Sequence, residues 1–211
     1  MVLQLYGIPY STCTQRVLIT LHEKGVPYEI NAVNLATGAH KDPEYMKKQP
    51  FGQVPCIDDD ESRAICRYLA IKYADQGTPL IPPQSDLQAT ALFEQAASVE
   101  QADFDAFAGK LVFERVFKKK YSGLQPNEEM ANNLQTELGK RLDVYDQILS
   151  RQPYANGSEF SLADIFHIPY GSLLAAADAG ELIPERPHVK AWWDRITGRE
   201  SWAKTKALNA K

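Results

Sequence analysis

The fold is decided within residues 2–33, which read VLQLYGIPYSTCTQRVLITLHEKGVPYEINAV. The apolar start of this stretch runs into a Gly-Ile-Pro turn signal, which predicts a short strand. After Ser11, apolar residues recur at helical spacing up to Lys24 and Gly25, a cation and a glycine typical of a helix end. Residues 28–33 then show a second strand pattern. A strand, a helix and a strand in this order favour a right-handed crossover and a parallel strand pair.

The remaining pattern predicts two domains of different class. Residues 1–78 alternate between strand and helix signals, including a short strand at Cys56-Ile57, and we expect an α/β domain there. Residues 79–86 are proline-containing and lack periodicity, as in a linker. Residues 87–211 contain no strand pattern, and we expect an all-α domain. Its helices are predicted at 87–120, 128–149, from Ser161 onward and at 187–197.

Composition excludes several classes of function. A net charge of −4 gives no basic footprint for nucleic acid, and Lys118-Lys119-Lys120 is typical of a solvated helix face. No stretch of about 18 apolar residues occurs, so we expect no membrane span. Three cysteines are too few, and odd in number, for a disulfide framework, which favours a reducing compartment such as the cytoplasm. The cysteines and histidines lack metal-ligand spacing, and the N-terminus does not resemble a signal peptide, so neither a metal nor secretion is expected.

The turn before the first helix could hold a reactive sulfur. A helix N-terminus carries unsatisfied N–H groups and a partial positive charge, which lower the pKa of a thiol placed there. The Ser11 hydroxyl either caps the helix or also donates a hydrogen bond to such a thiolate, and the residues alone leave both readings open. Cys13 fits either a small core residue or a second thiol with a lowered pKa.

Three further groups would suit the rest of a short peptide. Val54-Pro55 is either an ordinary turn or a cis proline that presents its backbone to a peptide ligand. Glu61-Ser62 either caps a helix or binds the head of an amino acid. His40-Lys41 either lies in a solvated loop or holds a carboxylate. Taken in order, these groups describe a peptide with an amino-acid head, a central thiol and a terminal carboxylate.

Together these stretches resemble the glutathione transferases, and most closely the serine-type phi class. The motifs occur in order and at the family's spacing over nearly the whole chain. The resemblance rests on Ser11–Val17, Gly38–Lys41, Gln49–Pro55, Glu61–Tyr68, Leu142–Asp146, Phe160–Ile165, His167–Pro169 and Glu185–Val189.

The resemblance implies a thioredoxin-like N-terminal domain that binds glutathione as co-substrate, a helical domain for the second substrate, and a homodimer. It implies that the Ser11 hydroxyl is catalytic and stabilises the glutathione thiolate. The other implied glutathione-binding residues are Thr12, His40, Lys41, Gln53, Val54, Pro55 (as a cis proline), Glu61 and Ser62.

The chain departs from the family's pattern between Asp60 and Glu61, where several residues of strand and turn are absent. Losing a strand would damage a sheet this small. We therefore expect that a segment has been omitted here. A true deletion would displace Glu61 and Ser62.

The expected reaction is attack of the glutathione sulfur on a hydrophobic electrophile, with glutathione-dependent peroxidase activity compatible with the same site. Two alternatives stay open: a non-catalytic carrier of hydrophobic ligands, and a thiol transferase that uses Cys13 or Ser11. Aromatic residues at helical spacing are explained as well by core packing as by substrate binding. The candidate residues of the electrophile site are Tyr10, Thr12, Phe107, Phe113, Phe117, Tyr121 and Phe166.

Overall fold

The computed structural model describes residues 2–57 and 62–210, which group into two units. One unit combines Met1–Ile81 with Arg199–Lys211, and the other is Pro82–Gly198. The sequence-based boundaries assign residues 199–211 to the helical domain, whereas the structure groups them with the N-terminal unit.

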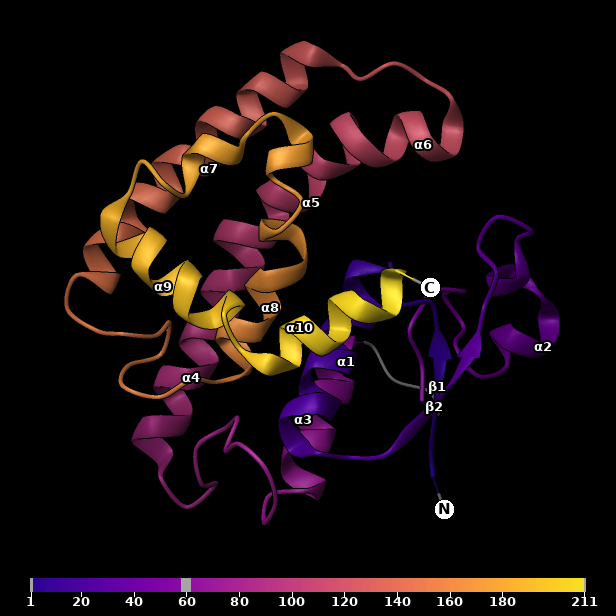
Figure 1. Cartoon of the computed structure of the whole chain (residues 1–211), viewed down its shortest axis with the longest axis horizontal. Coiled ribbons are helices and arrows are strands. Elements are labelled where there is room, and N and C mark those ends of the chain that lie inside the picture. Colours follow the sequence, from indigo (N-terminus) through magenta and orange to yellow (C-terminus); the bar gives the residue numbers. More distant parts are fainter. Residues whose placement is uncertain (1, 58–61, 211) are drawn as a thin grey trace. The chain divides into compact units, whose positions relative to one another are not determined.

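The first unit is built on the predicted strand–helix–strand order (Figure 1). Strands β1 (Leu3–Gly7) and β2 (Tyr28–Ala32) pair in parallel, as the sequence predicts. Helix α1 (Thr12–Lys24) connects them. It begins at its N-cap Ser11, and it ends at Gly25, whose φ of 62° is the left-handed conformation that favours glycine.

Helix α3 (Ser62–Lys72) packs along α1, and this contact forms the core of the unit. The side chains of Leu18 and Leu21 from α1, and of Ile65 and Leu69 from α3, have no solvent exposure. The predicted strand at Cys56-Ile57 is reduced to a single antiparallel bridge between Cys56 and Tyr6. The suspected omission between Asp60 and Glu61 lies outside the described residues.

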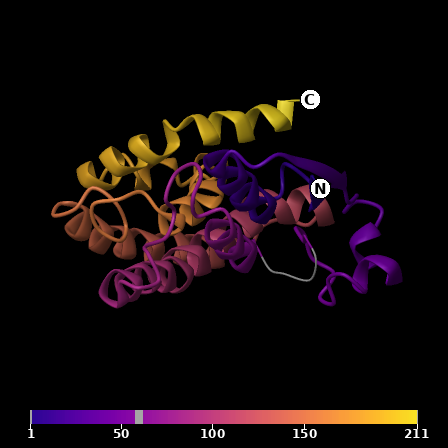
Figure 2. The same cartoon turned by 90° about the horizontal axis from the view of Figure 1, so that it is seen from below.

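The last helix, α10 (Glu200–Ala207), also packs on α1. Figures 1 and 2 both show the yellow α10 beside the indigo α1. Trp202 and Thr205 of α10 are buried, and His22 of α1 lies between Ser201 and Thr205, with its Nδ1 3.0 Å from the Thr205 hydroxyl. These contacts explain why the C-terminal segment belongs to the α/β unit.

Among its described residues the second unit contains helices, turns and one isolated bridge between Tyr154 and Gly157, but no strand, in agreement with the predicted all-α domain. Helix α7 (Glu128–Leu149) has the bounds that the sequence predicts. Helices α8 (Leu162–Gly171) and α9 (Pro187–Thr197) follow. The predicted capping box is present: the Asp164 carboxylate accepts the N–H of Ser161 at 2.9 Å. Within the described residues, no helix combines the length and apolar character that crossing a membrane requires.

The long helix predicted over 87–120 is present, but it is not a regular α-helix. Two π-helical stretches interrupt it, at Glu100–Asp105 and Phe113–Phe117. They separate the α-helical parts α4 (Leu87–Val99), α5 (Ala106–Val112) and α6 (Lys118–Ser122). π-helical stretches are rare in proteins, and those that occur are frequently found at functional sites.

Candidate functional site

Ser11 lies at the point where β1 turns into α1. Its Oγ accepts the backbone N–H of Thr14 at 3.4 Å, which confirms the capping reading. This bond is long and uses only an acceptor lone pair, so the hydroxyl hydrogen stays available to a ligand. Ser11 is therefore a helix cap, and its donation to a bound thiolate stays a prediction.

Val54-Pro55 lies beside this turn. The peptide bond between the two residues is cis, as the family resemblance implied. The backbone of Cys56 exchanges two hydrogen bonds of 2.9 Å with Tyr6 at the end of β1. Pro55 also lies close to Gly7, the last residue of β1, which places the cis proline next to the turn that leads into α1.

The loop before the cis proline is held by two side chains that the sequence analysis did not single out. Tyr45, from α2 (Pro43–Met46), donates its hydroxyl to the carbonyl of Gln53 at 2.6 Å. The Gln49 side chain accepts the N–H of Gln53 at 3.2 Å. Burial, followed by the neighbouring Cys56, raises the pKa of Tyr45, so this hydroxyl stays a donor at neutral pH. No periodicity or motif signals such turn-specific hydrogen bonds, which is why the sequence did not reveal them.

His40 and Lys41 lie against the same loop. The Lys41 ammonium donates to the carbonyl of Phe51 at 2.9 Å. A Cβ at Gly52 would lie 2.6 Å from the His40 carbonyl, so the two segments touch through backbone. The Nδ1 atom of His40 is shielded from solvent and has no hydrogen-bond partner among the described residues. An unsatisfied nitrogen and a nearby ammonium form a suitable place for a carboxylate.

The remaining predicted glutathione-binding residues are less well defined. Ser62 is buried at the first turn of α3, where the backbone N–H groups have no acceptor within the helix itself and can bind an anion. Glu61 lies outside the described residues. Thr12 is buried in the first turn of α1. Cys13 is partly exposed rather than a core residue, and its sulfur lies 3.9 Å from a guanidinium nitrogen of Arg16.

The predicted electrophile-site residues fall into different environments. Phe166 has no solvent exposure and packs in the core of the helical unit, which favours the alternative that it is a core residue. Phe107 is half-buried, and the Arg141 guanidinium covers its ring at 3.9 Å. Phe113 and Tyr121, in contrast, are 51% and 56% exposed. The exposed candidates are therefore Tyr10 in the first unit and Phe113 and Tyr121 in the second. Phe117 is half-buried.

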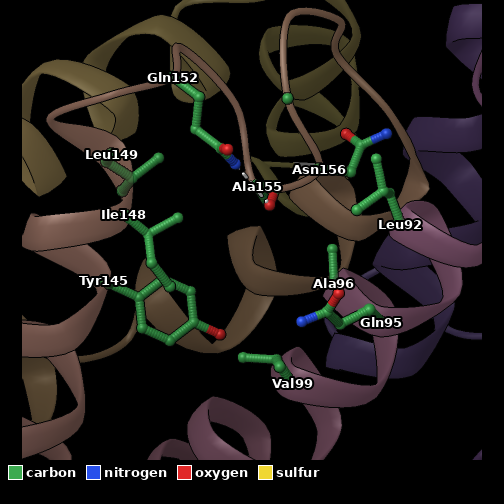
Figure 3. A pocket seen from close by; sticks show the side chains of 11 residues that line it. Leu92, Gln95, Ala96, Val99, Tyr145, Ile148, Leu149, Gln152, Ala155 and Asn156 are labelled. Carbon is green, nitrogen blue, oxygen red and sulfur yellow. Dashed lines mark hydrogen bonds between the residues drawn. The ribbon is translucent and has the colours of Figure 1, made fainter. Parts of the chain in front are cut away.

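The helical unit also has a cavity of about 320 Å³ between α4, α7 and the loop that follows α7 (Figure 3). Its lining carries no charged side chain. Tyr145 lies at its wall with its hydroxyl 3.0 Å from Nε2 of His167, and burial raises the pKa of that hydroxyl well above its usual value. None of the predicted electrophile-site residues lines this cavity.

Comparison with known proteins gives the class of the chain. The model of the glutathione S-transferase N-terminal domain matches residues 1–71, and that of the C-terminal domain matches residues 104–200. The chain belongs to the glutathione S-transferase family, and its fold is the one that the sequence resemblance implied.

Within that family the chain belongs to the phi class. It is 47% identical over 197 residues to glutathione S-transferase PM239X14 from Arabidopsis thaliana, covering 90% of this chain and 89% of the relative. The crystal structure of glutathione transferase F2 from Populus trichocarpa superposes with a TM-score of 0.92 at 39% identity, covering 99% of both chains. Maize glutathione S-transferase I, solved with an atrazine–glutathione conjugate, superposes with a TM-score of 0.88 at 33% identity over 97% of this chain and 96% of that one.

Proposed function

We propose that this chain transfers glutathione to hydrophobic electrophiles, and that Ser11 stabilises the glutathione thiolate. The observation that carries the proposal is the position of Ser11: its hydroxyl stands at the N-terminus of α1, beside the cis Val54-Pro55 bond. The helix terminus and the hydroxyl both favour the charged form of a sulfur bound there, so they lower its pKa. The maize relative solved with an atrazine–glutathione conjugate supports a transfer reaction in this class.

The tripeptide has a suitable partner at each part of its length. The backbone of Val54 would pair with its central residue, Gln53 would hold the peptide, and Ser62 with Glu61 would bind the γ-glutamyl head. His40 and Lys41 would hold the glycine carboxylate, since the Lys41 ammonium has two further N–H donors besides the one that it gives to the Phe51 carbonyl. Thr12 would assist through its backbone at the helix start.

The reaction needs no acid or base from the protein beyond this stabilisation. The thiol proton leaves to solvent, the sulfur forms a bond to the electrophilic carbon, and the bond from that carbon to the leaving group breaks, so that the leaving group departs with the electron pair. Holding both reactants together contributes further, because it removes the entropy cost of their encounter. We also propose that the enzyme acts as a cytoplasmic homodimer, that its linker is 79–86, and that the same site supports peroxidase activity.

The experiment measures conjugation of chlorodinitrobenzene by the wild type and by two variants, Ser11→Ala and Ser11→Thr. In Ser11→Ala we expect turnover to fall by roughly 10- to 100-fold, because one hydrogen bond to a charged sulfur is lost. The affinity for glutathione should stay nearly unchanged. Ser11→Thr keeps the hydroxyl and the cap, and should retain most of the turnover. The ultraviolet absorbance of bound thiolate should titrate at higher pH in Ser11→Ala.

Three outcomes would count against the proposal. Unchanged turnover in Ser11→Ala would remove this hydroxyl from the mechanism. Absence of turnover in the wild type, together with tight binding of hydrophobic dyes, would favour the ligand carrier. Glutathione-dependent disulfide reduction that is lost in a Cys13→Ser variant would favour the thiol transferase, since Cys13 is partly exposed.

A further inference from the structure

Val54 lies between two residues whose backbone groups are already paired within the protein. Gln53, directly before it, has a hydrogen-bond partner for both its N–H and its carbonyl. Cys56, two positions after it, exchanges two hydrogen bonds of 2.9 Å with Tyr6 in β1. Among the described residues, neither the N–H nor the carbonyl of Val54 itself has a partner. A half-buried residue with both backbone groups unpaired is suited to pair with an extended peptide.

Two side chains hold the backbone of Gln53, and we call this pair of contacts the Gln53 clamp. The Tyr45 hydroxyl donates to the Gln53 carbonyl at 2.6 Å, and the Gln49 side chain accepts the Gln53 N–H at 3.2 Å. Gln49 is only 4% exposed, and its own N–H donates to the Tyr45 carbonyl at 3.0 Å. The Gln53 clamp is therefore part of a closed ring of hydrogen bonds that joins α2 to the loop before Val54.

The Tyr45 hydroxyl is the part of the Gln53 clamp that fixes the direction of an unpaired group. The Gln53 carbonyl and the Val54 N–H belong to one planar peptide unit, and the peptide bond between these two residues is trans. In a trans unit the C=O and N–H bonds point in opposite directions. A hydroxyl that holds the carbonyl on one side therefore directs the Val54 N–H to the other side, away from Tyr45.

Within the part of the chain that the structure describes, no second donor substitutes for this hydroxyl. Only Tyr45 donates to the Gln53 carbonyl there, and a distance of 2.6 Å is at the short end of the range for hydroxyl donors. Without the hydroxyl, the peptide unit between Gln53 and Val54 has no hydrogen bond at either of its polar groups. The unit would rotate more freely, and a peptide that binds to it would have to order it at a cost in entropy.

We propose that Tyr45 is a positioning residue of the glutathione site: it holds the Gln53 carbonyl so that the Val54 N–H faces the backbone of the bound tripeptide. The inference rests on the proposed glutathione transfer and adds to its site a residue that does not touch the substrate. Ser11 acts on the sulfur from the start of α1, whereas Tyr45 acts, through Val54, on the peptide backbone. Tyr45 therefore governs how tightly glutathione binds, and Ser11 governs how readily the bound sulfur ionises.

The test measures conjugation of chlorodinitrobenzene by the wild type and by Tyr45→Phe, with the concentration of glutathione varied. We expect the KM for glutathione to rise by about three- to tenfold, the range of one hydrogen bond between neutral groups, while kcat stays nearly unchanged. Calorimetric titration with glutathione alone should show the same rise in Kd. The ultraviolet absorbance of the bound thiolate should titrate at the same pH as in the wild type. Ser11→Ala should show the opposite pattern, with turnover lowered and affinity kept.

Tyr28→Phe is the matched control, because Tyr28 is another half-buried tyrosine of the same unit. Its hydroxyl lies 2.7 Å from Nε2 of His22 and belongs to β2 rather than to the loop before Val54. Both tyrosine variants lose one hydrogen bond and should lower the free energy of unfolding in urea by similar amounts, but Tyr28→Phe should keep the wild-type KM and kcat. Gln49→Met removes the other contact of the Gln53 clamp and should also raise the KM for glutathione with kcat unchanged.

The proposal is overturned if Tyr45→Phe binds glutathione with the KM and Kd of the wild type, since the hydroxyl would then support only the fold. It is also overturned if Tyr28→Phe raises the KM as much, because any loosening of the unit would then have this effect. A thiolate that titrates at higher pH in Tyr45→Phe would overturn the division of roles with Ser11. Failure of glutathione transfer itself has a different signature: the wild type would not turn over chlorodinitrobenzene, while calorimetry would still compare glutathione binding by the wild type and Tyr45→Phe.

Discussion

Glu23 and Arg199 form a two-pronged ion pair across 176 positions of the sequence: the Nε and Nη2 atoms of Arg199 donate to the Glu23 carboxylate at 2.6 and 2.7 Å. The hydroxyls of Thr78 and Ser201 each donate to the same carboxylate at 2.6 Å. Burial by itself would raise the pKa of Glu23, but the hydrogen bonds from Arg199, Ser201 and Thr78 outweigh it and hold the pKa below its usual value. This cluster fastens α10 to α1.

Replacing the arginine should therefore loosen the C-terminal helix. In Arg199→Gln the Glu23 carboxylate, whose side chain is only 5% exposed, loses its cationic partner. We expect the free energy of unfolding to fall by about 2 kcal/mol, the range of hydrogen bonds to a charged group. Urea unfolding measures the loss, and Lys190→Gln, which breaks an exposed pair with Asp194, should cost less than about 1 kcal/mol. Equal losses would show that the Glu23 cluster contributes no more to stability than an exposed ion pair does.

The neighbouring His22 should make the same contact sensitive to mild acid. Burial lowers the pKa of His22 below 6.5, although a hydrogen bond to the Ser201 carbonyl opposes this, and Lys204 and Glu23 contribute charges of opposite sign. Since the unfolded chain then binds the proton more readily than the folded one, stability falls as the pH drops below 6.5 and levels off below the folded pKa.

The effect can be separated from that of Glu23 by its pH range. The lowered pKa of Glu23 affects stability only below about its ordinary value of 4.5, where protonation removes the stabilisation. In His22→Gln we expect a flatter dependence of the free energy of unfolding between pH 7 and 5. A slope equal to that of the wild type over this range would contradict the assignment to His22.

Gly7 should not tolerate a side chain. A Cβ there would lie 2.8 Å from the Thr14 hydroxyl, 3.1 Å from its methyl group and 3.4 Å from Cβ of Pro55, and Thr14 is fully buried. We expect Gly7→Ala to lower the free energy of unfolding by about 1–3 kcal/mol, as overpacking does. Because Pro55 belongs to the proposed site, the KM for glutathione should rise as well.

Gly109 is the matched control for that substitution. It lies inside α5, and a Cβ there would meet the Tyr170 ring at an ordinary 3.5 Å. Alanine is favoured over glycine within a helix by about 1 kcal/mol, so Gly109→Ala should be neutral or stabilising. A loss of stability in Gly109→Ala as large as in Gly7→Ala would contradict the packing argument.

Local signals in the sequence predicted the elements well. Ser11 and Gly25 delimit α1 because capping chemistry acts over a few residues, and α7 keeps its predicted bounds for the same reason. The capping box of Ser161 and Asp164 was also predicted from the sequence. These features depend on neighbours in the chain, so the sequence alone contains the information.

Features that depend on tertiary packing could not be predicted in this way. Periodicity shows that Phe113 and Phe166 lie on helices, but not that the first is exposed and the second is in the core. The two π-helical stretches do not disturb the spacing of apolar residues enough to be recognised in the sequence. The attachment of α10 to α1 depends on Glu23 and Arg199, which no local pattern connects. The contact of Tyr45 with Gln53 is of the same kind.

Asp164 should be the most sensitive polar residue of the helical unit. Its carboxylate has no solvent exposure and accepts the N–H groups of Ala155 and Ser161 at 2.9 Å and the indole N–H of Trp192 at 2.8 Å. Asp164→Ala leaves the buried N–H groups of Ser161 and Trp192 and the part-buried N–H of Ala155 without this acceptor, and each buried group of this kind costs about 1–3 kcal/mol. We expect a total loss of about 3–5 kcal/mol in urea unfolding. Asp86→Ala removes a carboxylate that caps α4 at the surface, and should cost only about 1 kcal/mol. Both aspartates cap the start of a helix, so the difference between the two losses measures the effect of burying Asp164. Equal losses would mean that capping alone explains the role of Asp164.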